Sequence, residues 1–231
     1  MIRISIRIAL ILIPVLLAGA CIDDRETGQN TRQEGEIMLP EPRTTGEISI
    51  EEAMHNRRSV RRYTKDAITL NDLSQLLWAA QGITSEEGFR TAPSAGALYP
   101  LEVYVVAGNV DGLAGGVYRY RTEGHTLQRI RDGDLRKNLS ECALKQTQIM
   151  DAAAGIVFAA VFNRTTAKYG ERGAQYAYIE AGHAAQNVYL QAEASGLGVC
   201  AVGAFYEQEV SELLALSRDE TPIYILTVGK V

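Results

Sequence analysis

Positive charge is concentrated in one short stretch of the sequence. Residues 57–62, which read Arg-Arg-Ser-Val-Arg-Arg and which we call the basic segment, lie in a chain whose net charge is −5. A guanidinium group binds phosphate through paired hydrogen bonds, and a serine hydroxyl adds another donor. This composition suits a phosphorylated cofactor. Taken alone, however, the segment favours the alternative of a solvated basic turn, because short basic runs are common.

Other kinds of functional centre find little support in the residue pattern. The cysteines Cys21, Cys142 and Cys200 are too few and too scattered for a disulfide framework or a metal site, although one Cys142–Cys200 bridge stays open. Neither a hydrolase nucleophile motif nor a Gly-x-Gly-x-x-Gly fingerprint of a separate nicotinamide domain occurs. The acidic net charge argues against general nucleic-acid binding. We therefore expect no bound metal and no nucleic-acid partner.

The first 20 residues have the layout of a secretory signal peptide. Arg3 and Arg7 precede an apolar run, Ile8–Ala20, that is shorter than the roughly 20 residues of a membrane-spanning helix. Small residues then lead into Cys21 as in a lipobox, where the thiol is acylated. An uncleaved signal anchor is the weaker alternative. We expect Cys21 to carry a lipid that holds the protein at the extracytoplasmic face of the cell membrane.

The pattern divides the rest of the chain into two parts. Residues 21–46 are polar, contain glycine and proline, and show no apolar period, so we predict a lipidated flexible tether. Residues 47–231 are predicted to form a single folded domain.

Helices and strands are mixed along this predicted domain. The pairs Ser49/Glu52 and Thr69/Asp72 are capping boxes that predict two helix starts, and Gly82 predicts the end of the second helix. Further helices are expected at 134–144, 173–195 and 207–216, and strands at 101–106, 117–120, 126–130, 154–162, 198–203 and 222–228. Such a mixture predicts an α+β or α/β fold.

Five segments resemble signatures of the nitroreductase-like flavoproteins. In chain order they lie within Arg57–Tyr63, Pro93–Glu102, Tyr178–Asn187, Gly196–Phe205 and Val228–Lys230. The second resembles that of the azoline-oxidising dehydrogenases of ribosomal peptide biosynthesis, the SagB/ThcOx branch. The resemblance implies an α+β nitroreductase-like fold with a central, mostly antiparallel sheet flanked by helices. It also implies an entwined homodimer with two FMN sites at the subunit interface.

The resemblance implies a role for individual residues at the phosphate of FMN. Arg57, Arg58 and Ser59 occupy the positions that bind the flavin phosphate in the family. The basic residue near the end of the chain, Lys230, would assist them.

The resemblance also implies which residues border the flavin ring. Pro93, Ser94 and Ala95 would pack along the flavin from the second subunit. The turn Gly203-Ala204 would lie near the ring, where glycine permits a close backbone approach. A plain turn is the alternative for each glycine.

Lys168 and Tyr169 resemble a Lys-Tyr step that is assigned acid–base work in the azoline-oxidising branch. Oxidation of an azoline sends a hydride to the flavin and a proton to a base. A lysine whose pKa is lowered by burial, or the adjacent tyrosine, could accept that proton. The alternative is a surface lysine beside a packing tyrosine at the start of a helix.

Two further residues are assigned mainly to packing. Trp78 lies among leucines and is predicted to be a core residue. His183 lies in the long helix, where Glu180, Gln186 and Asn187 have helical spacings from it. These four residues could form a polar network at the dimer interface.

We expect, in sum, an FMN-dependent oxidoreductase that moves hydride between the flavin N5 atom and a small or peptide substrate of azoline, nitro or quinone type. NAD(P)H could serve as electron donor and would then share the flavin pocket with the substrate. Export of the protein complicates the expected substrate and the expected electron donor, because the peptide-modifying relatives act inside the cell. The alternative is a membrane-tethered lipoprotein that binds flavin without turnover or is purely structural.

Overall fold

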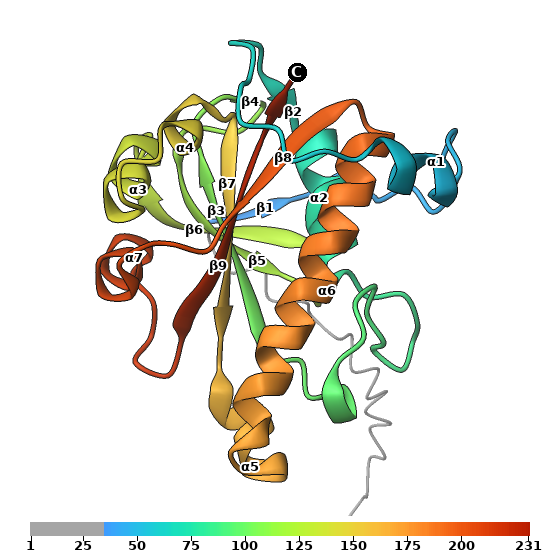
Figure 1. The fold of residues 1–231 in the computed structure, drawn as a ribbon, viewed down its shortest axis with the longest axis vertical. Coiled ribbons are helices and arrows are strands. Elements are labelled where there is room, and N and C mark those ends of the chain that lie inside the picture. The colour runs from blue at the N-terminus through green and yellow to red at the C-terminus, as the bar shows by residue number, and fades with distance from the viewer. Residues whose placement is uncertain (1–34) are drawn as a thin grey trace, which may run out of the picture. The chain divides into compact units, whose positions relative to one another are not determined.

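One seven-stranded antiparallel sheet forms the centre of residues 35–231, the part of the chain that this computed structural model describes (Figure 1). The strand order is β1-β6-β5-β3-β7-β9-β8. A separate parallel pair joins β2 (Ile68–Thr69) to β4 (Val110–Asp111). The strands of the large sheet are β1 (Glu36–Met38), β3 (Leu101–Ala107), β5 (Gly116–Arg121), β6 (Thr126–Asp132), β7 (Ala154–Ala160), β8 (Leu197–Val202) and β9 (Thr221–Lys230).

Side chains of the central strands alternate between two apolar layers. In β3, Val103 and Val105 face one layer, whereas Tyr104 and Val106 face the other. This follows from the pleat of a strand, which points successive side chains to opposite faces. All seven residues of β7 are buried, as the continuous apolar run predicts, because helices cover both faces of the sheet.

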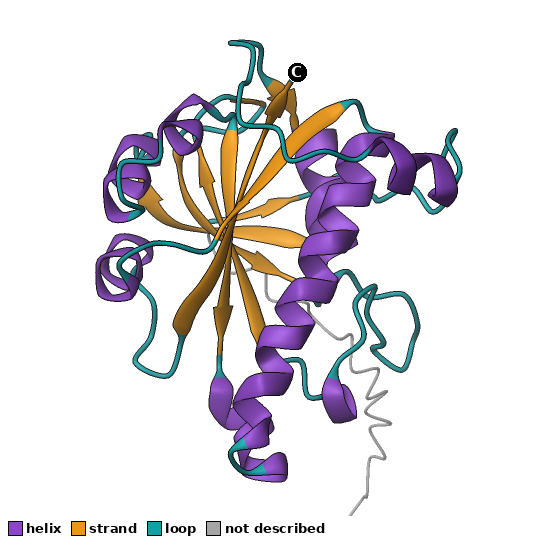
Figure 2. Cartoon of the chain, in the orientation of Figure 1, coloured by secondary structure: helices purple, strands orange, loops and turns teal. Residues whose placement is uncertain are grey.

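Helices cover the two faces in two groups (Figure 2). The core beside one face contains residues of α2 and α6, and the core beside the other contains residues of α3, α4 and α7. The short helices α1 and α5 both contact α6. The helices are α1 (Ile50–Asn56), α2 (Leu70–Gln81), α3 (Arg136–Cys142), α4 (Thr147–Asp151), α5 (Phe162–Tyr169), α6 (Arg172–Ala194) and α7 (Glu207–Leu214), with a 3-10 turn, η1, at Ala95–Ala97.

The long helix α6 packs closely because its inner face consists mostly of small side chains. Ala177, Ala181, Ala184 and Ala185 are all buried there. Short side chains let the helix approach α2 and the sheet while leaving few voids. Glu180 lies on the same inner face, where a charged residue is unusual.

Local sequence signals predict most of these elements correctly. Thr69 and Asp72 form the complete predicted capping box, and α2 ends at Gly82. Ser49 accepts a hydrogen bond from the Glu52 N–H at 3.1 Å and so begins α1. The predicted α+β class and the mostly antiparallel sheet are confirmed. The short elements β1, β2, β4, α4 and α5 carry no strong local signal, and the sequence pattern did not indicate them.

The ordered domain begins earlier than the predicted boundary at residue 47. β1 pairs with β6, and the buried side chain of Leu39 joins the core. The Arg43 N–H donates to the Gln75 side chain at 2.8 Å. Residues 36–43, which the polar composition assigned to the tether, therefore belong to the fold because α2 and β6 supply their partners.

The predicted signal peptide and lipid anchor, and the possible disulfide, remain to be compared with the structure. The proposed signal peptide (1–20) and the lipidation site Cys21 lie outside the described residues. Within residues 35–231, no helix is both long enough and apolar enough to cross a membrane. Cys142 and Cys200 are both free thiols, so the disulfide that the sequence left open is not formed.

Candidate functional site

The basic segment leaves the end of α1 and runs along the free edge of β8. Ser59 forms a parallel bridge with Val199, whose carbonyl accepts the Val60 N–H at 2.8 Å. Gly198 permits this approach, since a Cβ atom there would lie 2.8 Å from the Val60 Cβ. The sheet edge therefore fixes the backbone that carries the arginines.

Tyr63 anchors the end of this segment. Its hydroxyl lies 2.6 Å from the Thr227 hydroxyl and donates to the Val60 carbonyl at 2.8 Å. Gly229 makes room for the ring, because a Cβ atom there would lie 2.8 Å from the Tyr63 Cδ1. Burial raises the pKa of Tyr63, so its hydroxyl stays protonated and keeps its donor role.

Arg57, Ser59 and Tyr189 form the group best placed to bind an anion, and we call it the arginine group. The Arg57 guanidinium lies 5.4 Å from the centre of the Tyr189 ring and makes no hydrogen bond or ion pair with any residue of 35–231. The Ser59 and Tyr189 hydroxyls lie 3.3 Å apart, and Tyr189 also accepts the Ala201 N–H at 2.7 Å. A half-buried guanidinium beside a hydroxyl fits a phosphate group.

The other two predicted phosphate ligands are engaged elsewhere. Arg58 donates to the carbonyls of His55 and Arg57, both at 2.8 Å, and so closes the last turn of α1. The Lys230 ammonium forms an ion pair with Asp72 at 3.4 Å, at the start of α2. In the single chain, Arg58 therefore supports the arginine group, and Lys230 lies against a carboxylate.

A second set of predicted residues meets around η1. Gly96 has φ +63°, and a Cβ atom there would lie 2.6 Å from the Tyr169 hydroxyl and 2.8 Å from the Lys168 ammonium. The loop that contains Pro93, Ser94 and Ala95 thus packs directly on the end of α5. We call Ser94, Gly96, Lys168 and Tyr169 the loop group.

In the single chain, the setting of Lys168 and Tyr169 agrees with the alternative of a surface lysine beside a packing tyrosine, except for their place in the helix. They lie at the end of α5 and not at the start of a helix. Lys168 is exposed, with its ammonium 5.4 Å from the centre of the Tyr169 ring, and that ring packs edge-to-face on Tyr176. In the single chain the lysine is not buried, so the surface that would exclude water from it must come from another molecule.

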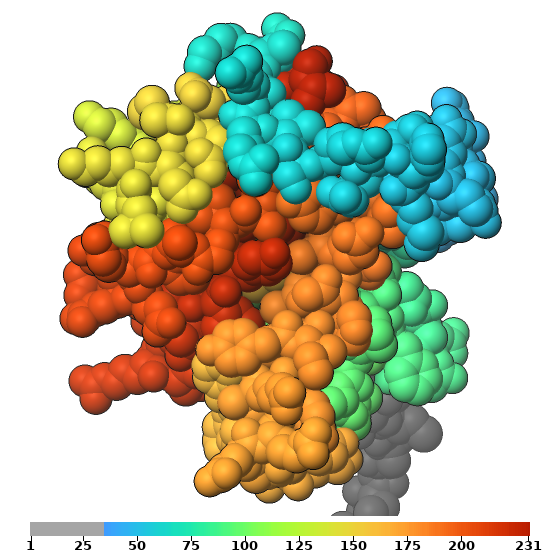
Figure 3. Space-filling model, viewed as in Figure 1, coloured from blue at the N-terminus to red at the C-terminus, as the bar shows by residue number. Residues whose placement is uncertain are grey.

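The turn Gly203-Ala204 follows β8 directly and is exposed. No atom lies within 4 Å of a Cβ built on Gly203, so a planar ring could approach the backbone there. Gln146 fixes the turn by donating to the Ala204 carbonyl at 3.0 Å. Figure 3 shows β8 and β9 recessed between α6 and α7, below the basic segment.

The arginine group and the loop group lie near opposite ends of α6. Tyr189 belongs to the first, whereas Glu180, beside the loop group, lies nine residues earlier in the same helix, or roughly 13 Å along its axis. Figure 1 shows α1 beside one end of α6 and α5 at the other. Within one chain, the residues predicted at the phosphate and those predicted at the loop therefore form two separate groups.

The expected polar network around His183 does not form within residues 35–231. His183 is exposed and makes no hydrogen bond there. Glu180 instead points inward, where Gln81 donates to it at 3.3 Å, and Asn187 donates to the Thr91 carbonyl at 3.1 Å.

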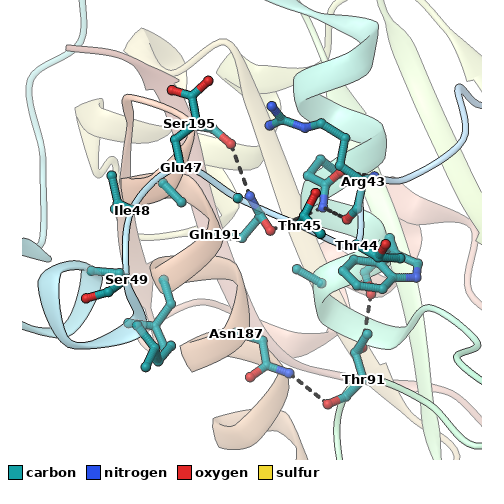
Figure 4. Close-up of a pocket in the computed structure, with 18 of the residues that line it drawn as sticks. Arg43, Thr44, Thr45, Glu47, Ile48, Ser49, Thr91, Asn187, Gln191 and Ser195 are labelled. Atoms are coloured by element: carbon teal, nitrogen blue, oxygen red, sulfur yellow. Dashed lines mark hydrogen bonds between the residues drawn. The ribbon is translucent and has the colours of Figure 1, made fainter.

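One cavity of the described part of the chain is lined by none of the predicted site residues. It has a volume of about 680 Å³ and is lined by the segment 43–50, α2 and α6 (Figure 4). Two of its polar side chains already have partners, because Gln191 donates to the Ser195 hydroxyl and Asn187 donates to the Thr91 carbonyl. Trp78 forms part of its wall and is only half-buried, which corrects its assignment to the core.

The fold and the order of the functional segments on it define a class of oxidoreductases. Residues 54–230 match the family model described as the Nitroreductase family, and the chain belongs to that family. Its members generally bind a flavin.

Particular relatives support this assignment. A protein of Methanocaldococcus jannaschii that carries the name nitroreductase is 46% identical over 195 residues, which are 84% of this chain and 96% of that protein. A crystal structure of a nitroreductase from Anabaena variabilis superposes with a TM-score of 0.74 at 31% identity. The match covers 84% of this chain but only 41% of the Anabaena chain.

A third relative bears on the branch within the family. The trifolitoxin operon protein TfxC of Rhizobium leguminosarum is 24% identical over 221 residues, which are 89% of this chain and 60% of that protein. Together with the Pro-Ser-Ala-Gly-Ala-Leu-Tyr-Pro segment, this match is consistent with the SagB-type branch of the family.

Proposed function

We propose that the protein is an FMN-dependent oxidoreductase whose two active sites each combine the arginine group of one subunit with the loop group of the other. The separation of these groups along α6 carries the proposal, because each is incomplete alone. The outer face of α6 supports it, since Tyr178 and Ile179 are 54% and 47% exposed there. Large apolar side chains on an otherwise folded surface favour contact with a second copy.

The residues of the arginine group fit the phosphate of FMN. The Arg57 guanidinium has no hydrogen-bond partner among residues 35–231, the Ser59 hydroxyl lies 3.3 Å from the hydroxyl of the ring that Arg57 faces, and the Gly203 backbone is open to a ring. When bound, FMN supplies the hydride chemistry. The chain's own task is to bind the phosphate, hold the ring against the turn at residue 203, and exclude water with the loop group of the partner.

Lys168 and Tyr169 would provide the proton acceptor. Oxidation of an azoline-type substrate removes a hydride and a proton from adjacent atoms, and only the proton needs a protein base. The ammonium and the phenol lie together against Gly96, so a subunit packed over them would bury both. The branch favours a small or peptide substrate of azoline type, with nitro or quinone compounds and NAD(P)H as further reaction partners to test.

The visible absorption spectrum of the purified full chain tests the cofactor, with the released compound identified by its mass. We expect bound FMN, and we expect Arg57→Ala to weaken FMN binding by about 100-fold, since a charge-assisted hydrogen bond contributes up to about 3 kcal/mol. Arg62→Ala removes the same charge from an exposed neighbour and should change the affinity less than about threefold. A colourless protein that refuses added FMN would sink the proposal and leave a structural lipoprotein.

Mixed dimers test the composite site. Arg57→Ala and Lys168→Met/Tyr169→Phe chains should each be inactive alone. In a mixed dimer, one of the two sites receives a wild-type arginine group and a wild-type loop group, so an equal mixture should regain roughly a quarter of the wild-type activity. Sites built within one chain would regain none.

We also propose that Cys21 carries a lipid that anchors the protein at the extracytoplasmic face of the membrane. The lipobox-like residues before Cys21 support this. Cys21→Ser should move the protein from the membrane fraction to the soluble fraction, and the mass of the mature N-terminus should lose its acyl chains. A wild-type protein without acyl chains would contradict the anchor.

A further inference from the structure

Glu180 is a buried carboxylic acid whose hydrogen bonds are incomplete. Its side chain is 2% exposed on the inner face of α6. Oε1 accepts a hydrogen bond from Gln81 at 3.3 Å, whereas Oε2 has no hydrogen-bond partner among residues 35–231. Burying a polar group without its partners costs about 1–3 kcal/mol. An alanine, such as those beside it, would fill the position without that cost.

The side chains around the Glu180 carboxylic acid either belong to the loop 90–99 or contact that loop. Gln81 precedes the loop 90–99, and its Oε1 accepts a hydrogen bond from Arg90 at 3.0 Å. The Ser94 hydroxyl, beside Glu180, accepts the Tyr99 N–H at 2.9 Å. Arg90 also stacks over the Tyr99 ring at 4.4 Å. The start, middle and end of the loop are thus connected through the inner face of α6.

The tip of the same loop carries Gly96, which packs on Lys168 and Tyr169. Any shift of the loop relative to α6 changes the position of Gly96 against these two residues. The carboxylic acid therefore lies beneath the proton-accepting end of the proposed site without touching it.

We propose that Glu180 is a positioning residue, which holds the loop 90–99 closed so that Gly96 stays packed on Lys168 and Tyr169. The part of this inference that concerns catalysis rests on the proposed function, whereas the part that concerns the loop does not. In its neutral form Glu180 can donate from Oε2 to the second lone pair of the Ser94 oxygen, which completes the network.

The charge state of Glu180 sets the strength of this closure. Burial raises its pKa to about 7, against the nearby Ser94 hydroxyl, the hydrogen bond from Gln81 and the fields of Arg90 and Arg164, all of which lower it. Arg164 is itself tied to the end of the loop, since it donates to the Tyr99 carbonyl at 2.7 Å. Opening the loop hydrates the carboxylate and returns its pKa toward 4.5. Ionisation therefore favours the open loop, and closure weakens as the pH rises from 4.5 to about 7.

Amide hydrogen exchange of the full-length protein tests the loop without need of a flavin. After correction for intrinsic rates, opening of residues 94–98 in the wild type should increase at least tenfold between pH 5 and pH 7. Glu180→Gln, which stays neutral and keeps a donor to Ser94, should show slow opening at both pH values. Glu193→Gln, the matched change on the same helix, should behave as the wild type. An opening equilibrium in the wild type that does not change with pH, or one in Glu180→Gln that still does, would overturn the inference.

A second measurement connects the loop to catalysis. Where the wild type reduces its flavin, the pH profile of kcat should fall through about pH 7, and Glu180→Gln should lose that fall with KM unchanged. Glu180→Ala should open the loop at every pH, because Gln81 and Ser94 lose their common partner. If no flavin binds but exchange depends on pH as described, the positioning role stands and the proposed function fails. If flavin binds and Glu180→Gln keeps the wild-type profile, the proposed function stands and the positioning role fails.

Discussion

The charged side chains beside the two halves of α6 differ in their burial and in their partners. Near one end, the Arg57 guanidinium lies over the Tyr189 ring, half-buried and without a partner of opposite charge among residues 35–231. In the first half of the helix, Glu180 is nearly inaccessible to solvent and accepts a hydrogen bond from Gln81 of α2. An accessible cation can meet a ligand at little desolvation cost, whereas a buried acid can act only through what it holds in place. The group proposed to bind the flavin phosphate and the residue proposed to position the loop therefore lie on different parts of a single helix.

The largest expected effect concerns the buried end, and it is a dependence of stability on pH. Between pH 4.5 and about 7 the folded state keeps the Glu180 proton while the unfolded state loses it, so the free energy of unfolding falls as the pH rises. Urea unfolding of the wild type should lose up to about 3 kcal/mol over this range relative to Glu180→Gln. Glu193→Gln serves as the control. If the free energy of unfolding depends on pH in the same way in the wild type and in Glu180→Gln, the proposed difference between Glu180 and Arg57 would be contradicted.

A smaller effect is expected at the contact between the loop and α5. Gly96→Ala places a methyl group at φ +63° and against the Tyr169 hydroxyl and Lys168, and should cost about 2 kcal/mol of thermal stability together with activity. Gly196→Ala is the control, because Gly196 has φ +65° with no atom within 4 Å of its Cβ position. The control should cost only the backbone strain, about 1 kcal/mol. Equal losses in both variants would show that the loop does not press on α5.

The smallest effect is expected at the arginine group. Tyr189→Phe keeps the ring under Arg57 but removes the hydroxyl that accepts the Ala201 N–H and contacts Ser59. We expect a loss of about 1 kcal/mol in denaturant unfolding and a fall of a few-fold in FMN affinity. Tyr224→Phe is the control, because that ring is only partly buried and belongs to the neighbouring β9. An FMN affinity that falls as far as in Arg57→Ala would mean that the hydroxyl, and not the guanidinium, is the main ligand.

Local features could be predicted from the sequence, and long-range features could not. The capping box of Thr69 and Asp72, the apolar run of β7 and the basic segment are read from neighbouring residues. The pairing of β1 with β6 depends on segments about 90 residues apart in the chain, and β1 has too few residues for a period to show. The hydrogen bond between Gln81 and Glu180 joins positions 99 residues apart.

The candidate site shows the same limit. The residues proposed to bind the phosphate follow from the family resemblance of the basic segment, but the hydrogen bonds of Arg58 to carbonyl groups and the ion pair of Lys230 with Asp72 depend on the fold. Glu180 looked like a neighbour of His183, because helical spacing places them within one turn. The fold points the first inward and leaves the second exposed, a distinction that only the packing of α2 against α6 decides.

The course of the basic segment along β8 also bears on the solubility of the protein. β8 is the last strand of the sheet, and Ser59 and Val60 cover part of its outer edge. An uncovered edge offers unpaired N–H and C=O groups on which strands of other chains can add. A ligand that holds Arg57 and Ser59 in place would also keep that edge covered, so cofactor loading and resistance to aggregation should rise and fall together.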